Sequence, residues 1–93
     1  MAETNIVLGG WSGFNFNLSA EAHNVFKAAL EGFTGVSYTP LAVATQVVAG
    51  TNYCYLCKGE VIVPGLPQIA ALVYIYQPLE GAPHITEISR INP

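Results

Sequence analysis

The sequence predicts an α+β domain in which a curved antiparallel β-sheet of about five strands wraps around one α-helix. One early segment shows a helical spacing of apolar residues, and several later segments alternate with a period of two. Short turns separate these segments, an arrangement typical of α+β folds. The expected element order is β-α-β-β-β-β. The chain is long enough for one core, so we expect a single domain over residues 1–93 with a flexible tail at residues 1–8.

The helix is predicted at residues 19–33. Ser19 is a suitable N-cap and Gly32 a suitable C-terminal stop, while polar residues such as Glu21 and Lys27 occupy the face expected to be wet. The opposite face is apolar and is formed by Ala22, Val25, Phe26, Ala29, Leu30 and Phe33. Because an apolar stripe must be buried, the helix should lie across one face of the sheet.

Four strands are predicted after the helix, together with a short first strand before it. In the first of the four, the alternation changes phase at Pro40, which indicates a bulge in an edge strand. The third is apolar on both faces and should be largely buried. The five predicted strands cover residues 9–14, 36–47, 51–58 with a possible continuation through residues 60–63, 68–77 and 84–91.

Charge and hydropathy exclude several classes of partner. The net charge is −3 and only Lys27, Lys58 and Arg90 are cationic, so we expect no nucleic-acid binding. The longest apolar run, residues 69–76, is too short to cross a membrane as a helix, so we expect no membrane partner. The N-terminus shows no secretory signal, which predicts a cytoplasmic protein.

The residues that could perform catalysis are few and scattered. The chain has no Asp, and its six Glu residues show no spacing that would pair two of them. His23 and His84 are expected at the surface. Cys54 and Cys57 lie within one predicted strand without a neighbouring cation, so they are expected to be inert free thiols that suit a reducing compartment. We therefore predict no enzyme activity, no metal and no cofactor, although a Cys-His dyad is conceivable.

Residues 45–53, TQVVAGTNY, contain three apolar side chains at a place where polar turn residues are usual. If that hairpin tip is exposed, it needs a partner. The pentapeptide Gln46-Val47-Val48-Ala49-Gly50 fits the Gln-x-Val-x-Gly motif of the cystatins, which are tight-binding inhibitors of papain-like cysteine proteases. The chain resembles this superfamily over almost its whole length, with Gly9 and Gly10 before the helix and the Pro78-Leu79 loop between the last two strands.

Within the superfamily, the chain is most similar to the stefins, the type 1 cystatins, which lack disulfides and signal peptides. The resemblance implies a cystatin-like fold and a reversible, competitive inhibitor of papain-like cysteine proteases. Three segments would form a wedge in the active-site cleft, with protease-binding residues Gly9, Gly10, Gln46, Val47, Val48, Ala49, Gly50, Pro78 and Leu79. It also implies a monomer that can form a domain-swapped dimer, and a strained Val48 at the tip would favour that exchange.

Each of these features has an alternative explanation. Val47 and Val48 can be strand residues of a buried hairpin, Gly9 and Gly10 can be linker, and Trp11 is more readily explained as a core or sheet-edge aromatic than as a protease contact. The competing function is a binding module with a cystatin-like fold that docks a peptide or protein without inhibiting a protease. A small ligand-binding or enzymatic domain of this fold is a third candidate.

Overall fold

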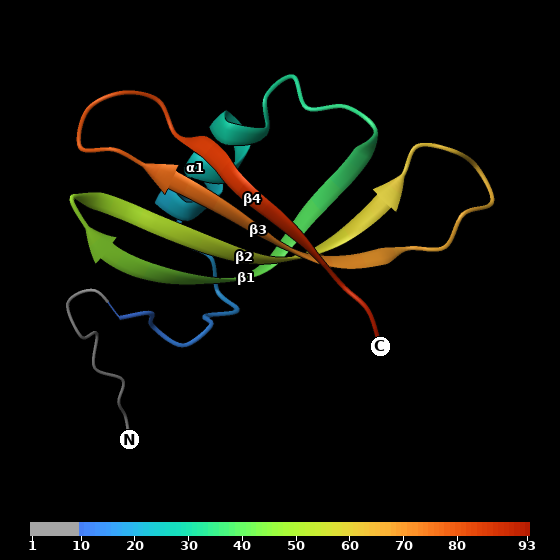
Figure 1. The fold of residues 1–93 in the computed structure, drawn as a ribbon, viewed down its shortest axis with the longest axis horizontal. Helices are drawn as coiled ribbons and strands as arrows, with labels where there is room; N and C mark the ends of the chain where they lie inside the picture. The colour runs from blue at the N-terminus through green and yellow to red at the C-terminus, as the bar shows by residue number, and fades with distance from the viewer. Residues whose placement is uncertain (1–9) are drawn as a thin grey trace.

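A computed structural model describes residues 10–93 and shows one helix packed against a four-stranded antiparallel sheet (Figure 1). The sheet order, β1-β2-β3-β4, follows the chain order, so each strand pairs with the next. The elements are α1 (Ala20–Leu30), β1 (Val36–Val48), β2 (Gly50–Val61), β3 (Ile69–Gln77) and β4 (His84–Ile91). The predicted α+β class is therefore confirmed, whereas the fifth strand is not found among the described residues.

The helix begins where the sequence indicates and ends earlier than expected. The Ser19 hydroxyl accepts a hydrogen bond from the backbone N–H of Ala22 at 3.1 Å, as an N-cap does. The helix ends at Leu30, before Gly32, which has a φ of +82°. Phe33 therefore lies outside the helix, and its ring packs instead on Tyr38 at the start of β1, with ring centroids 5.9 Å apart.

The strand predicted at residues 9–14 is replaced by an extended segment with only two isolated bridges. Trp11 pairs with Gln46 and Asn15 pairs with Val43, both antiparallel to β1. Gly9 lies outside the described residues. The segment of residues 10–19, called the N-terminal arm below, runs along the outer edge of β1 before it enters the helix (Figure 1).

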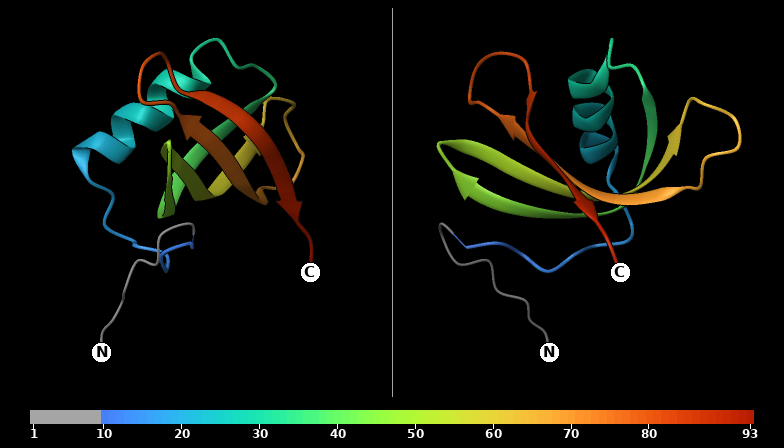
Figure 2. Two further views of the ribbon diagram at one scale, coloured as in Figure 1. Left: turned by 60° about the vertical axis from the view of Figure 1, so that its left-hand side comes forward. Right: turned by 45° about the vertical axis from the view of Figure 1, so that its right-hand side comes forward.

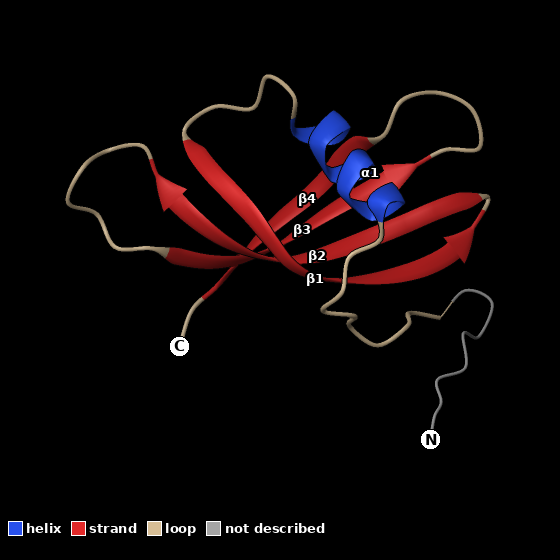
Figure 3. Ribbon diagram, turned by 180° about the vertical axis from the view of Figure 1, so that it is seen from behind, coloured by secondary structure: helices blue, strands red, loops and turns tan. Residues whose placement is uncertain are grey.

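The core lies between the apolar face of α1 and the concave face of the sheet, which curls around the helix (Figures 2 and 3). Tyr55 is at its centre and is fully buried. Its ring meets Phe26 edge-on at 4.8 Å between centroids, and its hydroxyl donates to the carbonyl oxygen of Ala22 at 2.8 Å. This buried hydrogen bond fixes α1 on β2. Of the predicted apolar stripe, Ala22, Val25 and Phe26 are buried, whereas Ala29 and Leu30 are partly buried.

The bulge predicted at Pro40 is present. The pairing between β1 and β2 shifts by one residue between Pro40 and Ala42, and β1 is an edge strand of the sheet. A bulge bends its strand and increases the local twist, which helps β1 curve around the helix (Figure 2). No helix within residues 10–93 has the length and hydropathy needed to cross a membrane.

Candidate functional site

Three segments far apart in the sequence lie side by side at one end of the sheet. The β1–β2 hairpin tip is central, the N-terminal arm lies beside β1, and the β3–β4 loop lies beside β2 (Figures 1 and 3). We call this end the loop edge and define it by Gly10, Gln46–Gly50 and Pro78–Leu79. The β2–β3 loop is at the opposite end of the molecule (Figure 1).

The hairpin tip is tight and its apolar side chains are exposed. Val48 pairs with Gly50, which leaves Ala49 alone at the apex. Val47 and Val48 are each 40% exposed, so they are not strand residues of a buried hairpin. Gly50 has a φ of +97°, a conformation that favours glycine. The strain expected at Val48 is not found, because no residue other than glycine has a positive φ within residues 10–93.

The tip rests directly on the start of the β3–β4 loop. A Cβ atom placed on Gly50 would lie 3.1 Å from the Cα of Pro78 and well inside 3.0 Å of the Gln77 carbonyl oxygen. No ordinary side chain fits in this space without displacing backbone. The Tyr76 hydroxyl also donates to the carbonyl oxygen of Ala49. Gly50 and Tyr76 therefore hold the two loops together.

Cross-strand hydrogen bonding supports the base of the tip. The Gln46 side-chain oxygen accepts from the side-chain nitrogen of Asn52 at 2.8 Å, and the two residues are directly paired between β1 and β2. This hydrogen bond crosses the hairpin just below its apex. Because the pair lies beside the bridge between Trp11 and Gln46, it also orders the place where the N-terminal arm joins the tip.

The β3–β4 loop presents an exposed apolar residue on an ordered backbone. Leu79 is 80% exposed, more than any other large apolar residue described. The Gln77 side chain donates to the carbonyl oxygens of Pro78 at 3.1 Å and Gly81 at 2.9 Å, which closes the loop. Leu79 is thus held out towards solvent beside the hairpin tip.

The N-terminal arm completes the edge. Gly10 directly precedes Trp11, which pairs with Gln46, so Gly10 lies near the Val47 end of β1. The Trp11 ring crosses to the sheet and meets Tyr74 edge-on with centroids 6.0 Å apart, while 43% of the residue stays exposed. Trp11 is therefore a sheet-edge aromatic, as the sequence favoured, and it anchors the arm.

None of the loop-edge residues carries a charge at neutral pH, and Glu80 of the β3–β4 loop directly follows Leu79. Val47, Val48 and Leu79 are apolar and exposed, and the backbone between them is held by hydrogen bonds and glycine packing. Such a surface can fill apolar subsites and expose backbone groups to a partner, but it offers no group for acid-base or nucleophilic chemistry.

The thiols are poorly placed for reactivity. Cys54 and Cys57 are free and buried in β2. Burial raises the pKa of the Cys57 thiol to about 12 and also raises the pKa of Cys54, so both stay protonated at neutral pH. His23 is exposed on α1 and His84 is exposed at the start of β4. Within the part of the chain that the structure describes, no three His, Cys, Asp or Glu side chains are grouped as metal ligands.

Sequence reasoning missed the residues that support the loop edge. Tyr76, Gln77 and Asn52 were expected only as strand residues, yet their side chains bond to the tip and the β3–β4 loop. A signal was present, because these polar side chains stand at the strand ends that flank the two predicted loops. Comparisons with protein-family models, with curated proteins and with solved structures gave no match to this chain.

Proposed function

We propose that this chain has a cystatin-like fold and is a reversible, competitive, tight-binding inhibitor of papain-like cysteine proteases. One observation carries the proposal. The three segments that the resemblance implies as a wedge come together at one end of the sheet, and their apolar side chains are exposed. The register of β2 and β3, in which Thr51 pairs with Gln77, brings the Pro78 loop against the Gly50 turn, and this contact supports the proposal.

The proposed mechanism is occlusion of the catalytic cysteine of the protease. Val47, Val48 and Leu79 would fill apolar subsites, while the narrow Ala49 apex would lie over the nucleophile without placing a peptide bond in a cleavable, extended form. The hydrogen bond from Tyr76 to the Ala49 carbonyl oxygen occupies that group within the inhibitor. Because the loops are already ordered, docking would cost little conformational entropy.

The active form in this proposal is a monomer in the cytoplasm, and the two buried, unpaired thiols suit a reducing compartment. Exchange of the arm and α1 between two chains would open the tip into one long strand. A domain-swapped dimer would therefore lack the inhibitory tip and would be inactive.

The test is a titration of papain activity with the purified protein and two variants. Ala49→Asp places a carboxylate at the apex, and Leu66→Asp makes the same kind of change on an exposed apolar residue of the β2–β3 loop at the opposite end. We expect stoichiometric inhibition by the wild type and by Leu66→Asp, and at least a hundredfold weaker inhibition by Ala49→Asp, about 2.7 kcal/mol. A wild type that leaves papain fully active refutes the proposal.

A second function is favoured by a different surface. An open groove of about 780 Å³ lies between α1 and the first half of β1, and it includes Phe26, Phe33 and Tyr38. The N-terminal arm covers only the second half of this edge strand, at Val43 and beyond. An extended peptide could pair with residues 36–40 in the same antiparallel sense, which is the binding-module alternative. Peptide binding that persists in a protein without effect on papain would favour it.

A further inference from the structure

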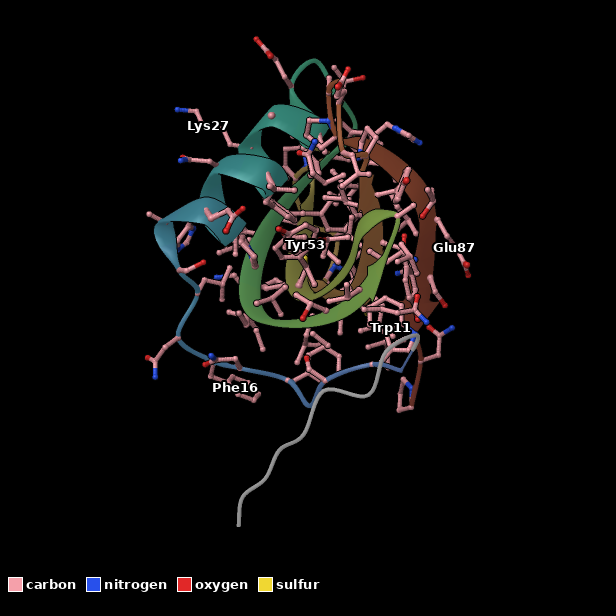
Figure 4. All side chains as sticks on the ribbon, turned by 90° about the vertical axis from the view of Figure 1, so that its left-hand side faces the viewer. Trp11, Phe16, Lys27, Tyr53 and Glu87 are labelled. Atoms are coloured by element: carbon pink, nitrogen blue, oxygen red, sulfur yellow. The ribbon has the colours of Figure 1, made fainter. Side chains whose placement is uncertain are left out.

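A second cavity lies under the N-terminal arm, away from the loop-edge contacts described above. It has a volume of about 490 Å³, within the usual size range of sites for small molecules. Its walls come from the arm, the first turn of α1 and the facing parts of β1 and β2. Figure 4 shows Tyr53 between the helix and the curled strands, with the segment that carries Phe16 passing below.

The Tyr53 hydroxyl is the unexplained group in this cavity. The residue is only 7% exposed and lines the cavity, yet its hydroxyl makes no hydrogen bond to any residue of the range 10–93. The hydroxyl of the nearby Tyr55, by contrast, donates to the Ala22 carbonyl oxygen. Buried hydroxyls in proteins nearly always have a partner, so a polar atom from outside the chain is expected here.

Three of the other side-chain polar groups around the cavity already have partners. The Ser12 hydroxyl donates to Gly13 and accepts from the Thr45 N–H, the Ser19 hydroxyl caps the helix, and the Asn15 side-chain oxygen accepts from the Asn17 N–H. The Glu21 carboxylate makes no hydrogen bond or ion pair with residues 10–93. Its charge contributes, after burial, to raising the pKa of Tyr53, so the hydroxyl stays neutral. The Glu21 carboxylate and the buried Tyr53 hydroxyl, both with free acceptor capacity, therefore line one cavity.

The charge of the cavity decides the class of ligand. Glu21 is the only charged residue among its walls. The N-terminus of α1 opposes this charge with about half a positive charge, so the net field remains negative and favours a cation. Phe14 and Tyr53 add aromatic rings, which attract ammonium groups. An ammonium head with a short apolar stem satisfies the carboxylate, the hydroxyl oxygen and the rings together.

We propose that the cavity beneath the N-terminal arm binds a primary organic ammonium ion, with the Glu21 carboxylate as counter-ion and the Tyr53 hydroxyl oxygen as a hydrogen-bond acceptor. Such a ligand touches the arm and α1 at once, because Asn15 and Asn17 lie on the same cavity as Glu21. Bound ligand therefore holds the arm against the helix. This site goes beyond protease inhibition and does not depend on it.

The test is an NMR titration of the whole ¹⁵N-labelled protein with n-butylammonium chloride, with sodium butyrate, 1-butanol and sodium chloride as controls. We expect saturable shifts at Asn15, Asn17 and Glu21 with butylammonium alone. Glu21→Gln should weaken this binding at least tenfold and Tyr53→Phe severalfold. Glu31→Gln, at the other end of α1 and outside this cavity, should leave it unchanged.

Other outcomes would overturn the proposal. Butylammonium that causes no saturable shift means that an ordered water alone satisfies Tyr53. Equal chemical-shift changes with butylammonium and with butanol mean that the cavity binds the apolar stem and does not recognise the charge. Binding that is equally strong in Glu21→Gln, or that shifts only residues around α1 and the start of β1, places the ammonium elsewhere.

Discussion

Gly50→Ala should destabilise the protein far more than the same substitution at Gly65. Both glycines have positive φ, +97° and +89°, so both substitutions impose an unfavourable backbone on alanine. Only Gly50 is crowded, because its new Cβ would meet the Gln77 carbonyl oxygen, whereas nothing lies within 4 Å at Gly65. The pair therefore separates the cost of the backbone conformation from the cost of the loop contact.

The expected magnitudes follow from these two terms. A positive φ destabilises a fold that contains alanine by about 1–2 kcal/mol. The lower conformational entropy of the unfolded chain offsets about 0.4–1 kcal/mol of this, so Gly65→Ala should lower the free energy of unfolding by roughly 1 kcal/mol. Overpacking against backbone adds about 1–3 kcal/mol at Gly50, for a total of roughly 2–4 kcal/mol. In a domain of this size, a difference of about 2 kcal/mol corresponds to roughly 8–16 °C in Tm.

Urea and thermal unfolding of the wild type and the two variants measure this difference, and papain titration shows its effect on function. Gly50→Ala should also weaken inhibition, because relief of the contact moves the hairpin tip away from the Pro78 loop. Gly65→Ala should inhibit like the wild type. Equal losses of unfolding free energy in the two variants would show that the contact between the loops contributes nothing, and the reasoning would fail.

Tyr76→Phe should cost about 1 kcal/mol of unfolding free energy and weaken papain inhibition severalfold, because it removes the hydrogen bond to the Ala49 carbonyl oxygen; an unchanged inhibition constant would contradict this role. The raised pKa of Cys57 predicts that the fold loses stability at alkaline pH. Because the fold favours the neutral thiol, the contribution of Cys57 to the free energy of unfolding is intact below pH 9.0 and is lost as the pH rises towards about 12. Urea unfolding across this range should show a shallower decline in Cys57→Ala than in the wild type, and parallel curves would refute it. Deletion of residues 1–10 should weaken papain inhibition at least tenfold, about 1.4 kcal/mol, and equal potency would remove this segment from the proposed site.

The features predicted correctly from the sequence are those with local causes. The Ser19 cap, the apolar stripe of α1 and the bulge at Pro40 each depend on a few neighbouring residues, and each is present. The end of the helix was misplaced at Phe33, because that aromatic continues the helical spacing but packs on Tyr38 instead. Periodicity alone cannot separate these two uses of one side chain.

The features that escaped prediction depend on pairing between distant segments. The contact of Gly50 with Gln77 follows from the register of β2 and β3, in which Thr51 pairs with Gln77. The N-terminal strand was overpredicted, because this glycine-rich segment aligns with the edge strand β1 through only two isolated bridges and does not form a continuous strand. For the proposed site, the sequence therefore indicated which segments take part but not the side chains that join them.

The N-terminal arm also shields the sheet from self-association. Its bonds to Val43 and Thr45 occupy backbone groups that would otherwise remain open on β1, and an open edge invites strands from other chains. Pro40, which has no N–H to donate, interrupts the same edge farther along. A chain cleaved after Asn15 would lose the hydrogen bonds between the arm and β1, and only Pro40 would still interrupt the edge. Proteolytic removal of this arm is therefore expected to promote aggregation through the exposed edge of β1.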